Sequence, residues 1–572
     1  MMEDAQPRTF RQVITPGLAG LTAEHVEAAQ KEARRSGVPP LDCLVRLGFV
    51  DEKTLLEAIA ARLGVEFCDL SHYSCPPEAV RLLQARQAMR YGVLPVKAEN
   101  GRVTIATCNP FDMASFDELR LILKRDIEMS LALREDIQKA IKRHYGIGAD
   151  AMEGVEESHG SSDTRRLTGD LADEAAAADA SVLKFVNLLL IEALKERATD
   201  IHIEPFESDL RVRYRVDGVL HDTAVPVSIK NFQAAIVSRI KVMANLDISE
   251  HRLPQDGRIK ISLAGEEFDL RISILPTPFG ESINIRILNR ASVFLSLEEL
   301  GLDRPDMEKL DALVRMPHGI ILVTGPTGSG KTTTLYACLN RINSADRKII
   351  TIEDPIEYQM RGLTQMQVHP IVGFTFSNAL RSMLRHDPDV MLVGEIRDTE
   401  TADITIRTAL TGHLVFSTLH TNDSAGAVTR LFDMGIEPFL ASSSILGIVA
   451  QRLVRRICAR CGERVEIEPE AIRELGVSRD DMAGGKYMAG KGCEYCRYTG
   501  YRGRIAISEI MVLNEPIRRL MLERASAGAI KRKACEIGMH TMRQDGWGKI
   551  KRGITTVTEV LRATAEDEIL ES

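Results

Sequence analysis

Residues 319–342 read GIILVTGPTGSGKTTTLYACLNRI, the most informative part of the chain for its fold. An apolar run typical of a buried strand is followed by a glycine-rich turn and then by a run that favours a helix. The turn matches the pattern G-x-x-x-x-G-K-[ST], in which backbone N–H groups and the helix start hold phosphate oxygens. The residues expected to bind a triphosphate are Gly325, Pro326, Thr327, Gly328, Ser329, Gly330, Lys331 and Thr332.

Two side chains of this loop have separate predicted tasks. Lys331 is expected to bridge the β- and γ-phosphates of ATP, and the Thr332 hydroxyl is expected to bind Mg²⁺. The alternative is a glycine-rich turn with a chance lysine, which needs neither a strand before it nor a helix after it. Both flanks are present, so the sequence predicts a P-loop.

A carboxylate is expected to complete the magnesium site. The run DVMLVGEIRD (389–398) reads as an apolar strand that ends in Gly394 and Glu395. Glu395 is placed to bind Mg²⁺ and organise water, because ligands bind at the carboxyl ends of parallel strands. Glycine stands where an aspartate is usual, which leaves an ordinary strand end as the alternative.

Two further segments end near the same predicted edge. TIEDPIEY (351–358) supplies Glu353, Asp354 and Glu357 after another strand, although such clusters are often helix caps or solvated loops. GHLVFSTLHTND (412–423) places His413 at the start of a strand and His420 just beyond its end. A single histidine is usually structural, but His420 is predicted to lie on the phosphate edge.

The chain outside this region is organised in several parts. From residue 319 short apolar strands alternate with helices, which indicates an α/β fold with a parallel sheet. A strand-rich region precedes it up to about residue 290, and a helix from Asp51 to Gly64 with short strands lies near the N-terminus. Residues 149–179 lack an apolar period and are rich in Ala, Asp, Glu, Ser and Gly, so a flexible linker is predicted.

Composition excludes some classes of function. The chain has 572 residues, 44% hydrophobic residues and a net charge of −8, so it has no global attraction for nucleic acid or anionic lipid. The start MMEDAQPRTF has no signal-peptide pattern. Apolar runs are too short to span a membrane. We therefore expect a cytoplasmic protein that reaches a membrane only through partners.

Four of the ten cysteines form two CxxC motifs. Cys458 and Cys461 precede Cys493 and Cys496, and 31 residues separate the pairs. Two such knuckles can complete a closed, structural Cys₄ site for Zn²⁺. The alternatives are a pair of redox motifs, which would need a thioredoxin-like context, and a zinc-bound nucleic-acid module.

The motifs resemble, in this order, those of the secretion ATPase superfamily: the Walker A loop, the aspartate box (351–358), the Walker B-like run (389–398) and the histidine box (411–423). RLPQDGRI (252–259) and PTPFGESINIRIL (276–288) are similar to its second N-terminal domain. Residues 425–458 resemble the type II secretion branch, the general secretion pathway E proteins. The resemblance implies a RecA-like core with a tetracysteine insert, preceded by a PAS-like α+β domain and a small α/β domain.

The resemblance also implies domain bounds and roles. The implied domains are 1–148 (with an MshEN-like part at about 60–145) for platform docking, 180–295 with arginine fingers, and 300–572 with the zinc insert at 457–498. Glu357 matches the water-activating carboxylate, Glu395 the Walker B acid and His420 the γ-phosphate sensor. Arg271 and Arg286 match arginines that reach the triphosphate. Weaker matches, equally suited to ion pairs, are Arg381, Arg385, Arg397 and Arg430.

The same resemblance implies an assembly and a task. Members are cytoplasmic hexamers, peripheral to the bacterial inner membrane, that hydrolyse ATP to drive assembly of a pseudopilus and protein export. Implied partners are inner-membrane platform proteins: the cytoplasmic domain of the L-type protein and the polytopic F-type protein. Some relatives bind cyclic di-GMP, but the spacing of Gly37 and Gly48 and the presence of Arg62 depart from the binding repeats. We do not expect that activity.

Three alternative functions stay open at this point. A type IV pilus assembly ATPase belongs to the same superfamily and would differ in its genomic neighbours. A RecA-like nucleic-acid motor would be stimulated by DNA or RNA. A regulatory nucleotide-binding protein without turnover would be insensitive to Glu395→Gln.

Overall fold

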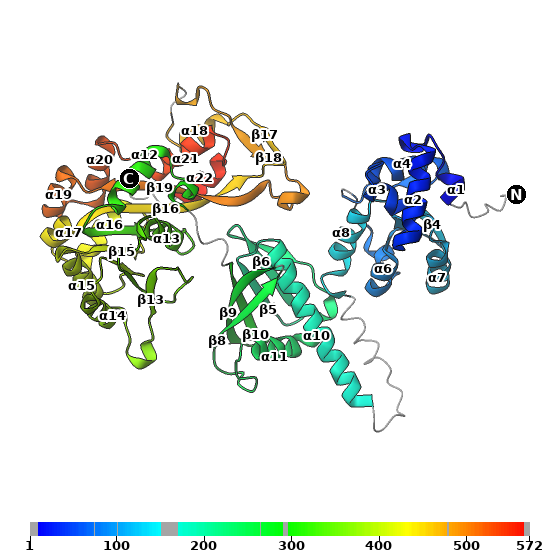
Figure 1. Ribbon diagram of the computed structural model, residues 1–572, viewed down its shortest axis with the longest axis horizontal. Helices are drawn as coiled ribbons and strands as arrows, with labels where there is room; N and C mark the ends of the chain where they lie inside the picture. Colours follow the sequence, from blue (N-terminus) through cyan, green and yellow to red (C-terminus); the bar gives the residue numbers. More distant parts are fainter. Residues whose placement is uncertain are drawn as a thin grey trace. The chain divides into compact units, whose positions relative to one another are not determined.

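The computed structural model describes residues 10–71, 73, 75–99, 101–149, 170–263, 265–289, 296–477 and 480–564. The chain divides into two compact units, residues 1–260 with 270–287 and residues 261–269 with 288–572. Figure 1 shows the elements of both. The domain bounds predicted above are finer than this division and stay predictions.

The N-terminal part of the first unit contains a helical cluster and a small sheet of order β1-β4-β3-β2. The predicted helix is α4 (Glu52–Leu63), with Asp51 accepting from the Thr54 N–H and Gly64 ending it at a φ of 68°. The other α-helices and strands are α1 (Phe10–Val13), α2 (Ala23–Ser36), α3 (Pro40–Arg46), α5 (Pro77–Val80), α6 (Ala85–Tyr91), α7 (Met113–Leu123), α8 (Arg134–Tyr145), β1 (Glu66–Phe67), β2 (Val93–Glu99), β3 (Arg102–Thr107) and β4 (Asp126–Leu131).

A six-stranded sheet of order β7-β6-β5-β10-β9-β8 forms the strand-rich region. Its elements are α10 (Asp170–Lys195), α11 (Gln233–Met243), β5 (Asp200–Pro205), β6 (Leu210–Val216), β7 (Val219–Thr223), β8 (Gln255–Leu263), β9 (Glu266–Thr277) and β10 (Gly280–Asn289). The buried Tyr214 of β6 donates its hydroxyl to the Leu189 carbonyl of α10. Helix and sheet therefore share an α+β core.

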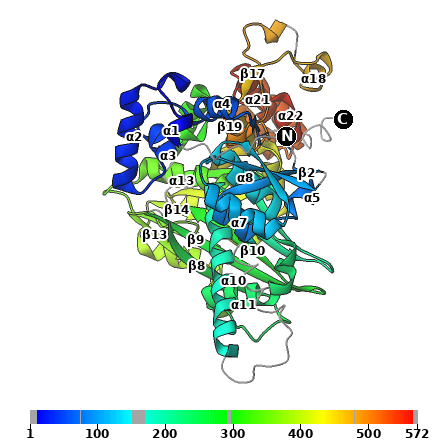
Figure 2. The ribbon, with the colours of Figure 1, turned by 90° about the vertical axis from the view of Figure 1, so that its right-hand side faces the viewer.

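The prediction of a flexible linker is wrong for the C-terminal end of that segment. The long helix α10, cyan in Figure 2, begins at Asp170, so residues 170–179 are helical. The reason lies in the segment DLADEAAAADA, because alanine has the highest helix propensity and acidic residues favour a helix N-terminus. The rest of the predicted linker, apart from residue 149, lies outside the described residues.

The second unit contains a seven-stranded sheet of order β13-β12-β14-β15-β11-β16-β19. Neighbours are parallel except for β16 and β19. The strands are β11 (Gly319–Thr324), β12 (Ile349–Glu353), β13 (Leu363–Gln367), β14 (Val390–Val393), β15 (Leu414–Leu419), β16 (Ile445–Ile457) and β19 (Tyr501–Val512). The predicted parallel α/β core is confirmed.

Helices cover both faces of this sheet. Ile320 and Leu322 of β11 belong to one hydrophobic core, while Ile321 and Val323 belong to the other. A strand buried on both faces explains the continuous apolar run of the sequence. The helices are α12 (Arg304–Val314), α13 (Lys331–Ile342), α14 (Phe376–Met383), α15 (Thr399–Leu410), α16 (Ser424–Asp433), α17 (Pro438–Ser444), α19 (Glu515–Leu522), α20 (Ala527–Glu536), α21 (Met542–Lys551) and α22 (Val557–Thr564).

The cysteine-bearing insert joins the ends of β16 and β19. It contains β17 (Gly462–Arg464) paired with β18 (Met488–Gly490), and α18 (Pro469–Glu474) between them. Across the described parts of the chain, no helix has the length and apolar character needed to cross a membrane.

Candidate active site

Four neighbouring parallel strands end at one edge of the sheet, in the order β12, β14, β15 and β11. The aspartate box begins in β12 and continues past its end, Glu395 follows β14, His420 follows β15 and the Walker A loop (residues 325–332) follows β11. Segments far apart in the sequence therefore converge at the edge where α/β proteins bind ligands.

The Walker A loop has the backbone that its glycines allow. Gly325 and Gly330 have φ values of 147° and 91°, which side-chain-bearing residues rarely adopt. A Cβ atom at Gly325 would lie 2.6 Å from the Gln451 carbonyl oxygen. The Ser329 hydroxyl is buried without a hydrogen-bond partner among the described residues. A closely packed loop with a buried hydroxyl that can still donate a hydrogen bond suits a bound phosphate.

Lys331 begins α13 at the end of this loop, and Thr332 follows it in the first helical turn. The lysine Nζ donates to the carbonyls of Gly325 at 2.8 Å and Pro326 at 3.2 Å. Burial lowers the pKa of Lys331, Arg452 also lowers it, and Glu395 acts in the opposite direction. The lysine thus lies within electrostatic reach of the predicted magnesium carboxylate.

Gln451 and Arg452 of β16 are site residues that motif reasoning missed. Gln451 donates to the Ser329 carbonyl at 2.7 Å and accepts from the Thr334 hydroxyl at 2.7 Å, so it braces the loop and α13. Arg452 donates to the Asn422 side chain at 3.2 Å in the histidine box. The only signal was their place in the family-like segment 425–458, because their contacts depend on β16 lying beside β11.

Glu395 is the centre of a charged cluster. Its Oε2 lies 3.1 Å from Nε2 of His420, and its Oε1 pairs with Arg397. Arg397 also lies 3.8 Å from the Asp354 carboxylate. The Glu395 side chain is only 14% exposed. These contacts link the Walker B-like run with both the aspartate box and the histidine box.

Glu357 lies in the loop after β12, half-buried, with its Oε2 atom shielded from solvent. Burial raises the pKa of both Tyr336 and Glu353, and the charge of Glu357 adds to both effects. Glu357 is therefore close to the buried residues that connect the aspartate box with α13.

The remaining predicted residues are two arginines of the first unit and several candidates of the second unit. Arg271 of β9 and Arg286 of β10 belong to the first unit, where Arg286 donates to Asp200 at 3.0 Å. His413 lies at the amino end of β15, 3.0 Å from the Thr408 carbonyl, in a structural setting. Of the weaker candidates, Arg397 joins the site, Arg381 pairs with Glu400 at 2.5 Å, Arg385 bonds within its own helical turn, and Arg430 is exposed on α16.

The four cysteines of the insert converge. Their sulfur atoms all lie within 4.8 Å of one another, and the closest pairs are separated by 3.7–3.8 Å. Although burial raises it, hydrogen bonds from the backbone of Cys493 and Gly500 lower the pKa of Cys496 to about 7. The cluster could hold one metal ion.

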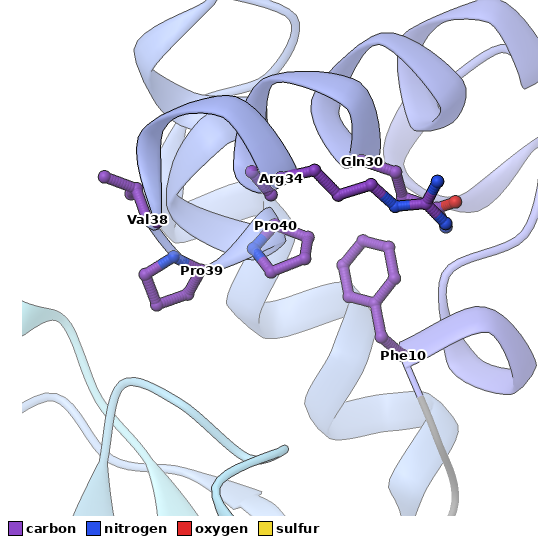
Figure 3. A pocket seen from close by; sticks show the side chains of 8 residues that line it. Phe10, Gln30, Arg34, Val38, Pro39 and Pro40 are labelled. Carbon is purple, nitrogen blue, oxygen red and sulfur yellow. The ribbon is translucent and has the colours of Figure 1, made fainter.

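A separate hollow of about 470 Å³ lies in the N-terminal part. Figure 3 shows Phe10, Val38, Pro39 and Pro40 as its apolar walls, with Arg34 and Gln30 beside them. Gly37, which also lines the hollow, belongs to the segment whose spacing departs from the cyclic di-GMP-binding repeats. The expected absence of that activity stays a prediction.

A parallel sheet covered on both faces, with a glycine-rich phosphate loop between strand and helix and carboxylates at the same edge, is the architecture of a P-loop ATPase. The chain belongs to the family described as Type II/IV secretion system protein, whose model matches residues 175–562. The MshEN domain model matches residues 63–151. The predicted RecA-like ATPase and its superfamily are confirmed.

Relatives of two named kinds cover nearly the whole chain. The chain is 44% identical to a type II secretion system protein E of Xanthomonas campestris pv. campestris, over 95% of each chain. It is 41% identical to a type IV pilus assembly ATPase PilB of Myxococcus xanthus, over 96% of this chain and 97% of the relative. The solved structure of the Legionella pneumophila ATPase DotB is 21% identical over 67% of this chain and 95% of its own, with a TM-score of 0.50, which shows the fold alone.

Proposed function

We propose that this chain hydrolyses ATP to ADP and phosphate to power pseudopilus assembly and protein export in type II secretion. The observation that carries the proposal is the convergence of the Walker A loop, Glu395, His420 and the aspartate box at one sheet edge. Near-full-length similarity to type II secretion system proteins E supports the choice of system.

Each residue of the site has a separate role in the proposed reaction. The Walker A backbone and Lys331 hold the phosphates, and Thr332 and Glu395 suit Mg²⁺, which would neutralise charge on the phosphate oxygens. Glu357 takes a proton from the attacking water as its oxygen bonds to the γ-phosphorus and the bond to ADP breaks. His420 holds Glu395 in place from the neighbouring strand.

Arg271 and Arg286 would supply the remaining positive charge. Guanidinium groups stabilise the charge of a phosphoryl-transfer transition state. Their presence in the other unit suits a motor, because hydrolysis could then be coupled to domain movement. The proposed assembly is a cytoplasmic homo-hexamer, peripheral to a bacterial inner membrane, that docks on the L-type and F-type platform proteins through its N-terminal region.

A type IV pilus assembly ATPase is the second candidate. The observation that favours it is the 41% identity to PilB over 96% of this chain, close to the value for the secretion protein. Neighbouring genes distinguish the two, since a secretin and pseudopilins indicate secretion and pilin genes indicate a pilus. A nucleic-acid motor has no comparable support, and the net charge of −8 argues against it.

The experiment that tests the function measures ATPase activity of the purified chain, with and without the cytoplasmic domain of the L-type protein. We expect turnover that rises with the partner and does not respond to DNA or RNA. No turnover in a verified hexamer with that partner would overturn the motor proposal, and stimulation by nucleic acid would favour the different class.

The four cysteines suit Zn²⁺ as a structural ion. Zn–S bonds of about 2.3 Å in a tetrahedron place the sulfurs about 3.8 Å apart, and the closest pairs lie 3.7–3.8 Å apart. Cys458, Cys461, Cys493 and Cys496 would fill all four positions, so the ion would tie the ends of β16 and β19 together without taking part in the reaction.

Metal analysis tests the zinc site. The purified chain is expected to contain one zinc per chain, and Cys461→Ser is expected to lose most of it, because a three-thiolate site binds more weakly. Cys535→Ser, a matched change on α20 outside the cluster, should retain the metal. Equal zinc content in the two variants would contradict the assignment.

A further inference from the structure

A buried carboxyl group at the end of β12 has no part in the reaction described so far. Glu353 is 4% exposed and accepts hydrogen bonds from Tyr336 Oη at 2.5 Å, Thr351 Oγ1 at 2.6 Å and Gln365 Nε2 at 3.2 Å. None of the lysines, arginines and histidines that the structure describes forms an ion pair with it. Burying an acid without a counter-ion costs free energy, so we expect this carboxyl group to have a structural or functional role.

The donors to Glu353 also hold the loop that contains Glu357. Gln365 Nε2 donates to the Tyr358 carbonyl at 2.9 Å, and Gln365 Oε1 accepts from the Met360 N–H at 2.7 Å. Tyr336 Oη also lies 3.4 Å from the Tyr358 carbonyl. The loop is thus fixed at Glu353, four residues before Glu357, and at Tyr358 and Met360 just after it.

Tyr336 joins this network to the phosphate site. It is the sixth residue of α13, which begins at Lys331, and it is 2% exposed. Because a helix is a rigid element, the position of the Tyr336 hydroxyl is set by the same segment that positions Lys331 and Thr332. A hydrogen bond from Tyr336 to Glu353 therefore fixes the start of the aspartate box relative to the Walker A helix.

We propose that Glu353 and Tyr336 form a positioning pair that acts on ATP hydrolysis through Glu357, by holding its carboxylate in register with the phosphate loop. This inference rests on the proposed role of Glu357. Both side chains are buried, so we assign them as positioning residues that act through Glu357. A buried hydrogen-bonded carboxyl suits this task because its two oxygens accept from separate elements, α13 on one side and β13 on the other.

Removal of the Tyr336 hydroxyl tests the pair. Tyr336→Phe is expected to lower kcat about 10- to 100-fold, since a misplacement of about 1 Å in a catalytic group has effects of that size. The KM for ATP should stay within twofold, because the Walker A loop is unchanged. Tyr145→Phe, which removes a hydroxyl bonded to the Val80 and Leu83 carbonyls, should leave kcat unchanged. Gln365→Met, on the opposite side of the network, should repeat the loss of kcat.

A double-mutant cycle separates this inference from the function on which it rests. In a Glu357→Gln background, measured by single turnover, Tyr336→Phe should cause no further loss, because the pair has nothing left to position. If the losses of Tyr336→Phe and Glu357→Gln were additive, the positioning role of the pair would be overturned. Parental kcat in both Tyr336→Phe and Gln365→Met would overturn it as well. Parental kcat in Glu357→Gln alone would instead overturn the proposed role of Glu357.

Discussion

Glu357→Gln is expected to lower kcat for ATP hydrolysis by about 10²- to 10⁴-fold, the range for loss of a general base. Glutamine has nearly the same size as glutamate, so the half-buried loop should keep its packing, but its amide cannot take a proton from water. ATP binding depends on the Walker A loop and Lys331, and it should stay within twofold of the parent. Steady-state turnover and equilibrium binding of a fluorescent ATP analogue measure the two quantities.

The matched control is Glu515→Gln on α19. That side chain is 71% exposed and pairs with Arg519 at the surface, away from the sheet edge. It should leave both turnover and binding unchanged. A Glu357→Gln variant that retains more than half of the parental kcat would show that another group activates the water, and loss of ATP binding would show a structural role.

Individual strands and helices were predictable where each has a local signal. The apolar run before the Walker A loop, the glycines of the loop and the cap at Asp51 are all set by neighbouring residues in the sequence. The helix α10 shows the limit of composition, because its alanine-rich start reads as a linker when only the apolar period is considered. Helix propensity would have found it.

The supports of the site were not predictable, because they join residues through the sheet. Gln451 reaches Ser329 only because β16 lies beside β11, an order that no local pattern encodes. Glu353 was recognised as one of three acids, but its burial and its bond to Tyr336 depend on α13 and β12, which are separate in the sequence, meeting in the fold. Sequence motifs identify the residues expected to contact the nucleotide. Tertiary packing determines which other side chains support those residues.

Lys549→Met is expected to destabilise the second unit by about 3–5 kcal/mol, the range for breaking a buried ion pair. Both side chains of the pair are buried, and the Lys549 Nζ donates to both carboxylate oxygens of Asp545 at 2.6 Å. Asp545 also accepts from the Ser508 N–H of β19 at 2.8 Å. Without the lysine, the buried carboxylate would keep, within the described part of the chain, one donor and no counter-ion.

The single tryptophan of the chain, Trp547, lies on the same helix α21 between the two partners, and stacks on Tyr487. Its fluorescence during urea unfolding therefore reports on this part of the structure, and the midpoint should fall in Lys549→Met. Asp545→Asn combined with Lys549→Met should recover most of the loss, because the neutral amide still accepts from Ser508 and needs no counter-ion. Lys533→Met, which removes an exposed lysine from α20, should shift the free energy of unfolding by at most about 0.5 kcal/mol. Equal midpoints for Lys549→Met and Lys533→Met would mean that the burial of the ion pair contributes nothing to stability.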